Sequence, residues 1–393
     1  MNDSVVILAR SLPIHNMGGM EVVCWDLCCS LAKHGLTVYV VTTPYPKGKN
    51  LTKVPEGIEL CILDKTKPGQ YSREWWSDSA DFIKGLKDKN VKAIISISAA
   101  GFSCLKYKNY FPKARFIMQA HGTSYDEISS KIRSGSLKRI LSAAKNALWF
   151  FKDGMSYPKF DDLVAIGESV YHSLISIPTK IIVGDSNVVK IENGIDNELF
   201  SDDLSFRDEI RQHLKIPKDA VVFLSASRLH NQKGVDNNLL AFKEYFSLNN
   251  NSYYLVCGDG EEAGRLSQLA SDLGISKNII FLGGKERCEL ARLMQASDVF
   301  VFLTKRVEGL PLNVLEAMSS GLPVIISKHL TFSASDKVIK VNPEEYKDIA
   351  SEIYGLLKSY DREKRFSYIL AQNTLSYATD RYLQLIYTDK VRK

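Results

Sequence analysis

Short runs of apolar residues alternate with longer polar or amphipathic stretches through the first half of the chain. In the first fifty residues, the pattern predicts a strand at 5–9, a glycine-containing loop at 17–20, a helix ending near His34 and a second strand at 37–42. Four further apolar runs predict strands at 57–63, 91–98, 114–119 and 162–166. Strand–helix–strand units of this kind build parallel sheets, so the first half predicts a doubly wound α/β domain.

The same pattern starts again after the turn formed by Asn193-Gly194-Ile195-Asp196. Five apolar runs in the second half predict strands at 220–226, 252–257, 278–282, 297–303 and 323–327. Residues 344–393 carry Tyr, Leu and Ile at helical spacing, and we expect them to be helical throughout. The fold class predicted from the pattern is α/β, with two Rossmann-like doubly wound domains at 1–194 and 195–370.

Composition agrees with two domains and excludes several protein classes. The chain has 393 residues and 45% apolar content, which is enough for two cores at about 100 to 200 residues each. Its formal net charge of +6 is modest, and we expect no nucleic-acid partner. The N-terminus does not resemble a signal peptide, no apolar run reaches about 18 residues, and the seven cysteines lack zinc-site spacing. These features predict a cytoplasmic protein with reduced thiols.

Loops that follow the strands of a parallel sheet are the places to look for ligand-binding residues. After the run at 220–226 come Ser227-Arg228-Leu229 and then Gln232-Lys233-Gly234. A guanidinium fork and a compact ammonium group at one strand end suit a diphosphate. Either residue alone is more often simply a solvated basic side chain. The next strand ends in Cys257-Gly258-Asp259-Gly260, where a turn lets backbone approach a ligand, although such turns are common.

The loop after the run at 297–303 carries the strongest pattern. Glu308 precedes Pro311, and Glu316 lies one helical turn beyond Leu312-Asn313-Val314. Because Pro311 suits a helix start, the amides around 312–314 are expected to point at an anion. Carboxylates accept hydrogen bonds from neighbouring hydroxyls, which fits a hexose at Glu308 and a ribose at Glu316. The alternative is two solvated glutamates, one on a loop and one on a helix.

Together these motifs resemble the family 4 glycosyltransferases (GT4), which are retaining enzymes with the GT-B fold. The resemblance is dense over 188–327 and looser in the first 45 residues and at His121. It implies two Rossmann-like domains that face a central cleft, the first binding the acceptor and the second the nucleotide-sugar donor. It also implies that a C-terminal helix, 371–393, packs back on the first domain.

The resemblance assigns roles to individual residues. It implies that Arg228 and Lys233 bind the diphosphate, that Glu316 binds the ribose and that Glu308 binds the sugar hydroxyls. His121 would face the anomeric region, and the expected catalytic set is Glu308, His121, Arg228 and Lys233. The remaining expected donor-binding residues are Gly18, Gly19, Gly258, Gly260, Gly283, Lys285, Leu310, Leu312, Asn313 and Val314.

The chain has no Asp-x-Asp sequence, the usual carboxylate pair that holds a divalent ion on a nucleotide sugar. We therefore expect no metal and no cofactor, with cations and backbone amides stabilising the leaving diphosphate. The resemblance implies front-face return, in which the leaving phosphate takes the acceptor proton and no protein base is needed. The chain departs from the family at 328–333, which replaces a glycine-rich stretch, and at Lys305-Arg306-Val307, which replaces small polar residues.

Residues 131–152 contain six basic residues, no acidic residue, and interleaved apolar and aromatic positions. A basic amphipathic helix is typical of binding to an anionic membrane surface. An ordinary helix packed on its own domain explains the pattern equally well.

The sequence thus predicts a metal-independent, retaining glycosyltransferase that moves a hexose-type sugar from a UDP or GDP sugar to a saccharide or lipid-linked acceptor. By resemblance, its setting is bacterial cell-surface polysaccharide or glycolipid synthesis at the inner face of the membrane. Two alternatives stay open: a nucleotide-sugar epimerase on the same fold, and a catalytically silent nucleotide-binding partner subunit.

Overall fold

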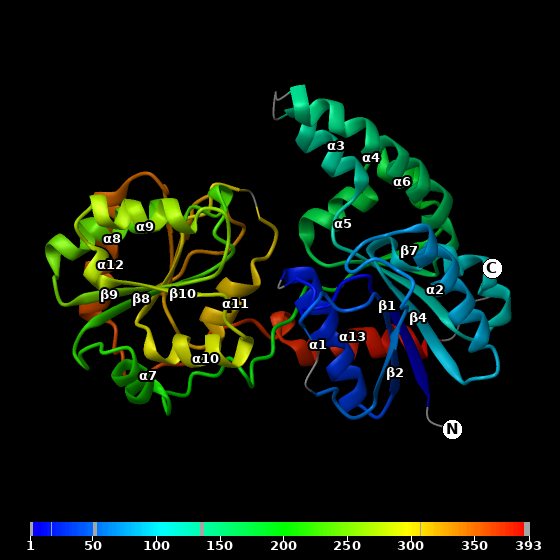
Figure 1. The fold of residues 1–393 in the computed structure, drawn as a ribbon, viewed down its shortest axis with the longest axis horizontal. Helices are drawn as coiled ribbons and strands as arrows, with labels where there is room; N and C mark the ends of the chain where they lie inside the picture. The colour runs from blue at the N-terminus through cyan, green and yellow to red at the C-terminus, as the bar shows by residue number, and fades with distance from the viewer. Residues whose placement is uncertain (1–2, 17, 50–52, 134–136, 307, 389–393) are drawn as a thin grey trace. The chain divides into compact units, whose positions relative to one another are not determined.

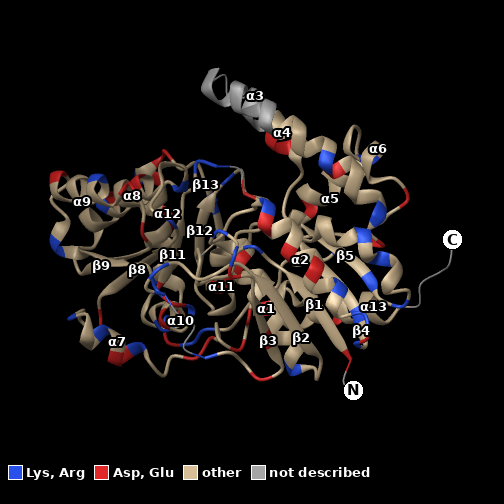
Figure 2. Ribbon diagram, turned by 45° about the vertical axis from the view of Figure 1, so that its right-hand side comes forward, with Lys and Arg blue, Asp and Glu red and all other residues tan. Residues whose placement is uncertain are grey.

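The computed structural model describes residues 3–16, 18–49, 53–133, 137–306 and 308–388, with backbone alone between 130 and 145. The chain divides into two compact units, which are described separately: unit 1 is Met1–Gly194 with Gln372–Lys393, and unit 2 is Ile195–Ala371. Figure 1 shows the course of the chain through both units. Lys and Arg are interspersed with Asp and Glu over each unit (Figure 2).

Unit 1 is built on a parallel sheet whose strand order is β3-β2-β1-β4-β5-β6-β7. Its strands are β1 (Ser4–Leu8), β2 (Thr37–Thr42), β3 (Ile58–Ile62), β4 (Val91–Ile97), β5 (Arg115–Ala120), β6 (Asp162–Ala165) and β7 (Asn187–Lys190). Its helices are α1 (Gly19–Lys33), α2 (Arg73–Gly85), η1 (Ser98–Tyr110), α3 (Ser124–Arg133), α4 (Leu137–Ser156), η2 (Tyr157–Lys159), α5 (Glu168–Ile175), α6 (Thr179–Val183), η5 (Ala371–Asn373) and α13 (Leu375–Tyr387), with η5 spanning the boundary between the units.

Unit 2 is built on a second parallel sheet, of order β10-β9-β8-β11-β12-β13. Its strands are β8 (Val221–Ala226), β9 (Ser252–Cys257), β10 (Ile279–Gly283), β11 (Val299–Phe302), β12 (Val324–Ser327) and β13 (Val338–Val341). Its helices are α7 (Arg207–His213), η3 (Asn231–Lys233), α8 (Val235–Leu248), α9 (Ala263–Asp272), η4 (Ser276–Asn278), α10 (Arg287–Ala296), α11 (Leu312–Ser319) and α12 (Tyr346–Ser359).

Each sheet is buried on both faces, which is why its central strands are continuous apolar runs. In β1, Val5 and Ile7 face α1 and α13, whereas Val6 and Leu8 face the core that α2 covers. In unit 2, α8, α9 and α12 cover one face of the sheet, and α10 and α11 cover the other. Alternation along a strand therefore distributes side chains to two cores in each unit.

Three sequence expectations need correction. Strand β7 was not predicted, because its four residues are half-buried or exposed and it lies at the sheet edge. Strand β13, also at an edge, was not predicted either. The segment 344–393 is not helical throughout, since irregular backbone separates α12 from η5 and α13. There, Tyr360 donates a hydrogen bond to the Gly321 carbonyl at 2.6 Å and holds the chain on unit 2.

Within the described residues, no helix combines the length and apolar character needed to cross a membrane. Helix α13 belongs to unit 1, where Tyr382 and Ile386 share a core with Cys24 and Leu27 of α1. The Thr379 hydroxyl also donates to the Ser30 hydroxyl of α1 at 2.8 Å.

Candidate functional site

The central strands β8 and β11 of unit 2 bring the predicted cations close to a predicted carboxylate. The two strands pair directly. From β8 the chain passes to the neighbouring strand β9 on one side, and from β11 it passes to β12 on the other side. This reversal is the switch point at which open α/β sheets bind ligands. Lys233 Nζ donates to Glu308 Oε1 at 2.6 Å and lies 5.6 Å from the centre of the Phe302 ring. The structure thus joins two predicted residues from different loops in one ion pair.

Arg228 lies on the same edge of the sheet, two residues after β8 ends. Its side chain is exposed, and within the described part of the chain its guanidinium makes no hydrogen bond or ion pair. A free guanidinium on the same edge of the sheet as an ion-paired lysine leaves a planar, bidentate donor for a phosphate.

Backbone contacts tie the loops at this edge of unit 2 to one another. Gly258 has φ +135°, and a Cβ there would lie 1.8 Å from the Ser227 carbonyl oxygen. Gly234, with φ +66°, would place a Cβ 1.9 Å from the Leu303 oxygen, and Gly260 is similarly close to Leu229. Packing between loops therefore accounts for these glycines, and their contact with a ligand stays a prediction.

Helix α11 is anchored to the end of β8 by Asn313. The Asn313 side chain donates through Nδ2 to the Ala226 carbonyl at 2.7 Å and accepts from the Val314 amide at 3.0 Å. The prediction of a free amide at Val314 is therefore wrong. The Leu312 and Asn313 amides, at the first two helical positions, have no intrahelical acceptor, and no acceptor for them is found among the described residues. The side chains of Leu310 and Leu312 pack against the core of unit 2.

Glu316 is buried, and Arg287 Nη1 lies 3.1 Å from its Oε1. The Arg287 guanidinium also lies 5.0 Å from the centre of the Phe200 ring. Sequence reasoning did not identify Arg287, although it opens α10 just after the predicted residues Gly283 and Lys285. Its bond to Glu316 orients the carboxylate that the motif assigned to a ribose.

The predicted residues at the end of β10 lie beside the glycine turn after β9. Gly283 accepts from the Gly258 amide at 2.8 Å, and the Gly284 amide donates to Asp259 Oδ2 at 2.9 Å. Lys285 Nζ lies 3.5 Å from Glu289 Oε1 on the next helical turn. A base contact by Gly283 and Lys285 stays a prediction.

The structure also explains the two departures from the family pattern. The Lys305 ammonium is held by Asp236 at 2.7 Å, and Val307 lies outside the described residues. In the 328–333 segment, Leu330 and Phe332 are buried and close the core beneath the sheet.

His121, which with Glu308 completes the predicted catalytic set beside the two phosphate-binding cations, follows β5 in unit 1. Its Nε2 lies 2.8 Å from Gln119 Oε1, and Gln119 Nε2 donates to the Tyr382 hydroxyl of α13 at 2.7 Å. Burial lowers the pKa of His121 to about 4, so the ring is neutral near pH 7. Because Gln119 Oε1 can only accept, His121 Nε2 carries the proton, and Nδ1 of the same ring is left as a hydrogen-bond acceptor. Sequence reasoning identified His121 but missed Gln119 and Tyr382.

Gly18 and Gly19 begin α1 in unit 1. Gly18 is the N-cap with an extended backbone, and Gly19 is the first helical residue. A Cβ at Gly18 would lie 2.5 Å from Glu21 Oε2, so the Glu21 carboxylate occupies the space beside this glycine. The loop and helix start are thus shaped around a carboxylate that sequence reasoning did not single out.

Family comparisons cover both units. The family described as Glycosyltransferase Family 4 matches residues 17–199, and the one described as Glycosyl transferases group 1 matches residues 206–370. The chain belongs to the family 4 glycosyltransferases. The resemblance inferred from the motifs of the second half is confirmed, and it extends through most of the first half.

A curated relative of this glycosyltransferase is the UDP-Gal:alpha-D-GlcNAc-diphosphoundecaprenol alpha-1,3-galactosyltransferase of Escherichia coli. The two are 34% identical over 155 residues, which cover 38% of this chain and 38% of the relative. The match therefore spans well under half of that enzyme's length.

Solved structures show the fold. Sucrose-phosphate synthase from Thermosynechococcus elongatus superposes with a TM-score of 0.73 at 17% identity, covering 98% of each chain. The Anabaena protein HepE, solved with UDP and glucose, gives a TM-score of 0.69 at 16% identity, covering 99% of this chain and 100% of that one. The predicted GT-B fold is confirmed.

Proposed function

We propose that this protein is a retaining, metal-independent glycosyltransferase that moves a hexose-type sugar from a UDP or GDP sugar to a saccharide or lipid-linked acceptor. The Lys233–Glu308 pair at the switch point of unit 2 is the observation that carries the proposal. It supplies a positive charge for the diphosphate and a carboxylate for the sugar within one contact. Sequence relatives that use UDP and GDP sugars support this donor class.

The proposed mechanism is electrostatic. Lys233, Arg228 and the free amides at the start of α11 stabilise the negative charge that develops on the leaving diphosphate. Glu308 holds Lys233 in place and accepts from a sugar hydroxyl, while Glu316, oriented by Arg287, accepts from the ribose hydroxyls. His121, neutral near pH 7, serves as a hydrogen-bonding group at the reacting sugar and not as a cation. The leaving phosphate takes the acceptor proton.

Thermal-shift measurements in EDTA with UDP, GDP, ADP and their sugars test the donor site. We expect one nucleotide to stabilise the protein and Arg228→Ala or Lys233→Ala to abolish the shift. Lys277→Ala is the matched control, because this exposed lysine precedes β10 at the opposite end of the sheet. No shift with any nucleotide would overturn the proposed donor site and favour a silent partner subunit.

Product analysis tests the reaction itself. With an α-linked donor, NMR of the product is expected to show an α linkage, and turnover is expected to persist in EDTA. A β-linked product would refute retention, and activity that requires added Mg²⁺ or Mn²⁺ would refute metal independence. Conversion of the donor to its epimer without an acceptor would identify the epimerase instead.

We also propose that α4, in the unit expected to bind the acceptor, docks the enzyme on the anionic inner face of the cell membrane. Of the basic segment 131–152, the side chains of 131–145 lie outside those described. In the described part, Leu148, Phe151 and Met155 are 68, 69 and 55% exposed, at spacings that place them on one helical face. Lys152 lies 4.4 Å from the Trp149 ring centre, so a cation accompanies this apolar face.

Two further exposed apolar residues of unit 1, Ile177 and Ile181, are 76 and 72% exposed. A basic residue beside an exposed apolar face suits anionic lipid better than a neutral partner. We expect flotation with vesicles containing phosphatidylglycerol and none with phosphatidylcholine alone. Phe151→Ser should weaken flotation and Leu248→Ser, 52% exposed on α8, should not. Membrane docking would be refuted if the two variants floated equally well, or if light scattering showed a dimer that depends on Phe151.

A further inference from the structure

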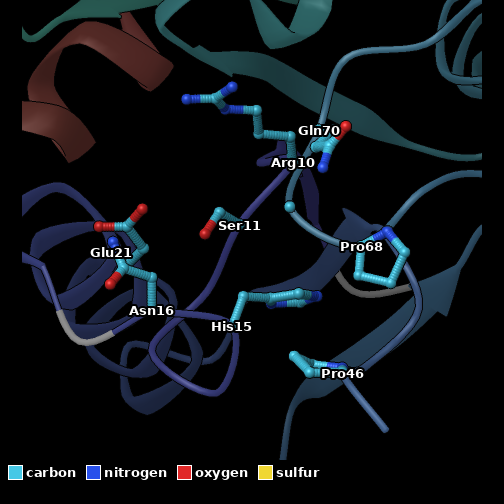
Figure 3. A pocket seen from close by; sticks show the side chains of 9 residues that line it. Arg10, Ser11, His15, Asn16, Glu21, Pro46, Pro68 and Gln70 are labelled. Atoms are coloured by element: carbon cyan, nitrogen blue, oxygen red, sulfur yellow. The ribbon is translucent and has the colours of Figure 1, made fainter.

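A cavity of about 270 Å³ lies in unit 1 beside the carboxyl ends of β1, β2 and β3. Its polar lining includes Arg10, Ser11, Asn16, Glu21 and Gln70, which come from the segments after β1 and β3 and from α1. Figure 3 shows these side chains around the cavity, with Pro46 and Pro68 on the side near His15. The place is where a parallel sheet presents its ligand-binding loops.

Glu21 is the unusual member of this lining. It is only 6% exposed, yet within the described residues its carboxylate makes no hydrogen bond or ion pair. A glutamate at the third helical position often accepts from the N-cap amide, but here the Gly18 amide donates to the Asn16 carbonyl at 3.0 Å. The carboxylate borders the cavity, so a ligand that donates to it there would give this acceptor a partner and stabilise the site.

Arg10 is the opposite charge of the cavity. Its guanidinium lies 4.6 Å from the centre of the Tyr71 ring, which fixes one face and leaves the edge of the fork for hydrogen bonds. Arg10 and Glu21 form no ion pair in the described structure although both line the cavity. Each charge is therefore available to a different part of one ligand.

His15 contributes a fixed wall and not a base. Its Nδ1 accepts from the Leu12 amide at 3.1 Å, and Nε2 lies 3.0 Å from the Pro44 carbonyl oxygen, to which it donates. With both ring nitrogens occupied, His15 has no lone pair left to take a proton from a substrate.

We propose that this cavity is an acceptor subsite that binds a single sugar ring carrying an anionic oxygen. Glu21 accepts from neighbouring ring hydroxyls, the Asn16 and Gln70 amides bind further hydroxyls, and Arg10 binds the anionic oxygen. The volume lies just below the roughly 300 to 1,000 Å³ of pockets for drug-sized ligands, which fits one ring and not an oligosaccharide. This inference rests on the proposed glycosyltransferase function.

Saturation-transfer NMR with glucose, glucose 1-phosphate and glucuronic acid tests the subsite. We expect the two charged sugars to bind at least tenfold more tightly than glucose, and the one that binds better distinguishes a phosphate from a carboxylate. Arg10→Gln should remove this preference. Glu21→Gln should weaken binding of all three sugars about tenfold, whereas Glu56→Gln, an exposed acid of the same unit, should not.

UDP affinity, measured on the same proteins, separates this inference from the proposed donor site. Glu21→Gln with unchanged sugar binding, or equal binding of all sugars by the wild type, would overturn the subsite. If Glu21→Gln unfolds the protein, Gln70→Ala, from a different loop, replaces it and should weaken binding severalfold. Failure of UDP to bind while sugars bind would refute the donor site and leave the cavity as a saccharide site.

Discussion

Tyr382→Phe removes one hydroxyl from α13 and tests the chain of hydrogen bonds that holds His121. The Tyr382 hydroxyl accepts from Gln119 Nε2 at 2.7 Å, and Gln119 is 1% exposed. Phenylalanine keeps the buried ring but leaves the amide without an acceptor, which costs about 1–3 kcal/mol. For a unit of this size, roughly 2–4 °C is lost per kcal/mol, so the melting temperature should fall by about 2–12 °C.

Thermal unfolding of the ligand-free protein measures this effect, with Tyr377→Phe as the control. Tyr377 lies on the same helix but is 42% exposed, so its variant should change the melting temperature little. Because Gln119 also contacts His121, Tyr382→Phe should shift the NMR signals of the His121 ring nitrogens and Tyr377→Phe should not. Equal melting temperatures and unchanged ring signals in both variants would refute the role assigned to this chain.

Three further perturbations test other parts of the structure. Gly258→Ala places a Cβ 1.8 Å from the Ser227 carbonyl oxygen at φ +135°. Backbone strain at such a φ costs about 1–3 kcal/mol, and the steric clash adds to it, so the free energy of unfolding in urea should fall by more than this amount. Asp298→Asn removes the buried carboxylate that pairs with Arg207, Arg211 and Arg365, and urea unfolding should show a loss of about 3–5 kcal/mol. Burial lowers the His121 pKa to about 4, so the unfolded chain binds the extra proton first as pH falls. Stability should be full above about pH 6.5 and fall by at most about 1.4 kcal/mol per unit toward pH 4, a slope that His121→Gln should reduce.

Burial explains which strands the sequence predicted. The central strands β1 and β8 have apolar residues on both faces, so each contains four consecutive apolar residues in the sequence. The edge strand β7 has only two consecutive valines between polar residues, and its pairing with β6 depends on backbone hydrogen bonds that no side-chain pattern reports. The irregular chain after α12 was mistaken for helix because its tyrosines fall at helical spacing. In the structure Tyr360 and Tyr368 instead donate hydrogen bonds to the carbonyls of Gly321 and Leu322.

The site residues that the sequence predicts are likewise those whose pattern is local, and the missed ones depend on tertiary structure. Arg228, Lys233, Glu308 and Glu316 were identified because motifs at strand ends are local in sequence. Arg287, which pairs with Glu316, was not identified, and neither were Gln119 and Tyr382, which hold His121. Tertiary structure selects such partners, since Gln119 and Tyr382 are 263 positions apart. Glu21 could have been noticed as an acid shortly after two glycines, but only the structure shows that its side chain is buried and that its carboxylate has no partner among the described residues.

Hydrogen bonds join the loops around the proposed donor site to one another. The Leu229 amide donates to the Asp259 carbonyl at 2.9 Å, the Gly258 amide donates to Gly283, and Asn313 holds α11 to the end of β8. A substitution in one of these loops therefore displaces groups in the others, so effects of neighbouring variants should not add. A single change to a predicted base or phosphate contact also moves the remaining contacts. Donor selectivity should therefore be measured on double variants that combine changes in the loops after β8, β9 and β10.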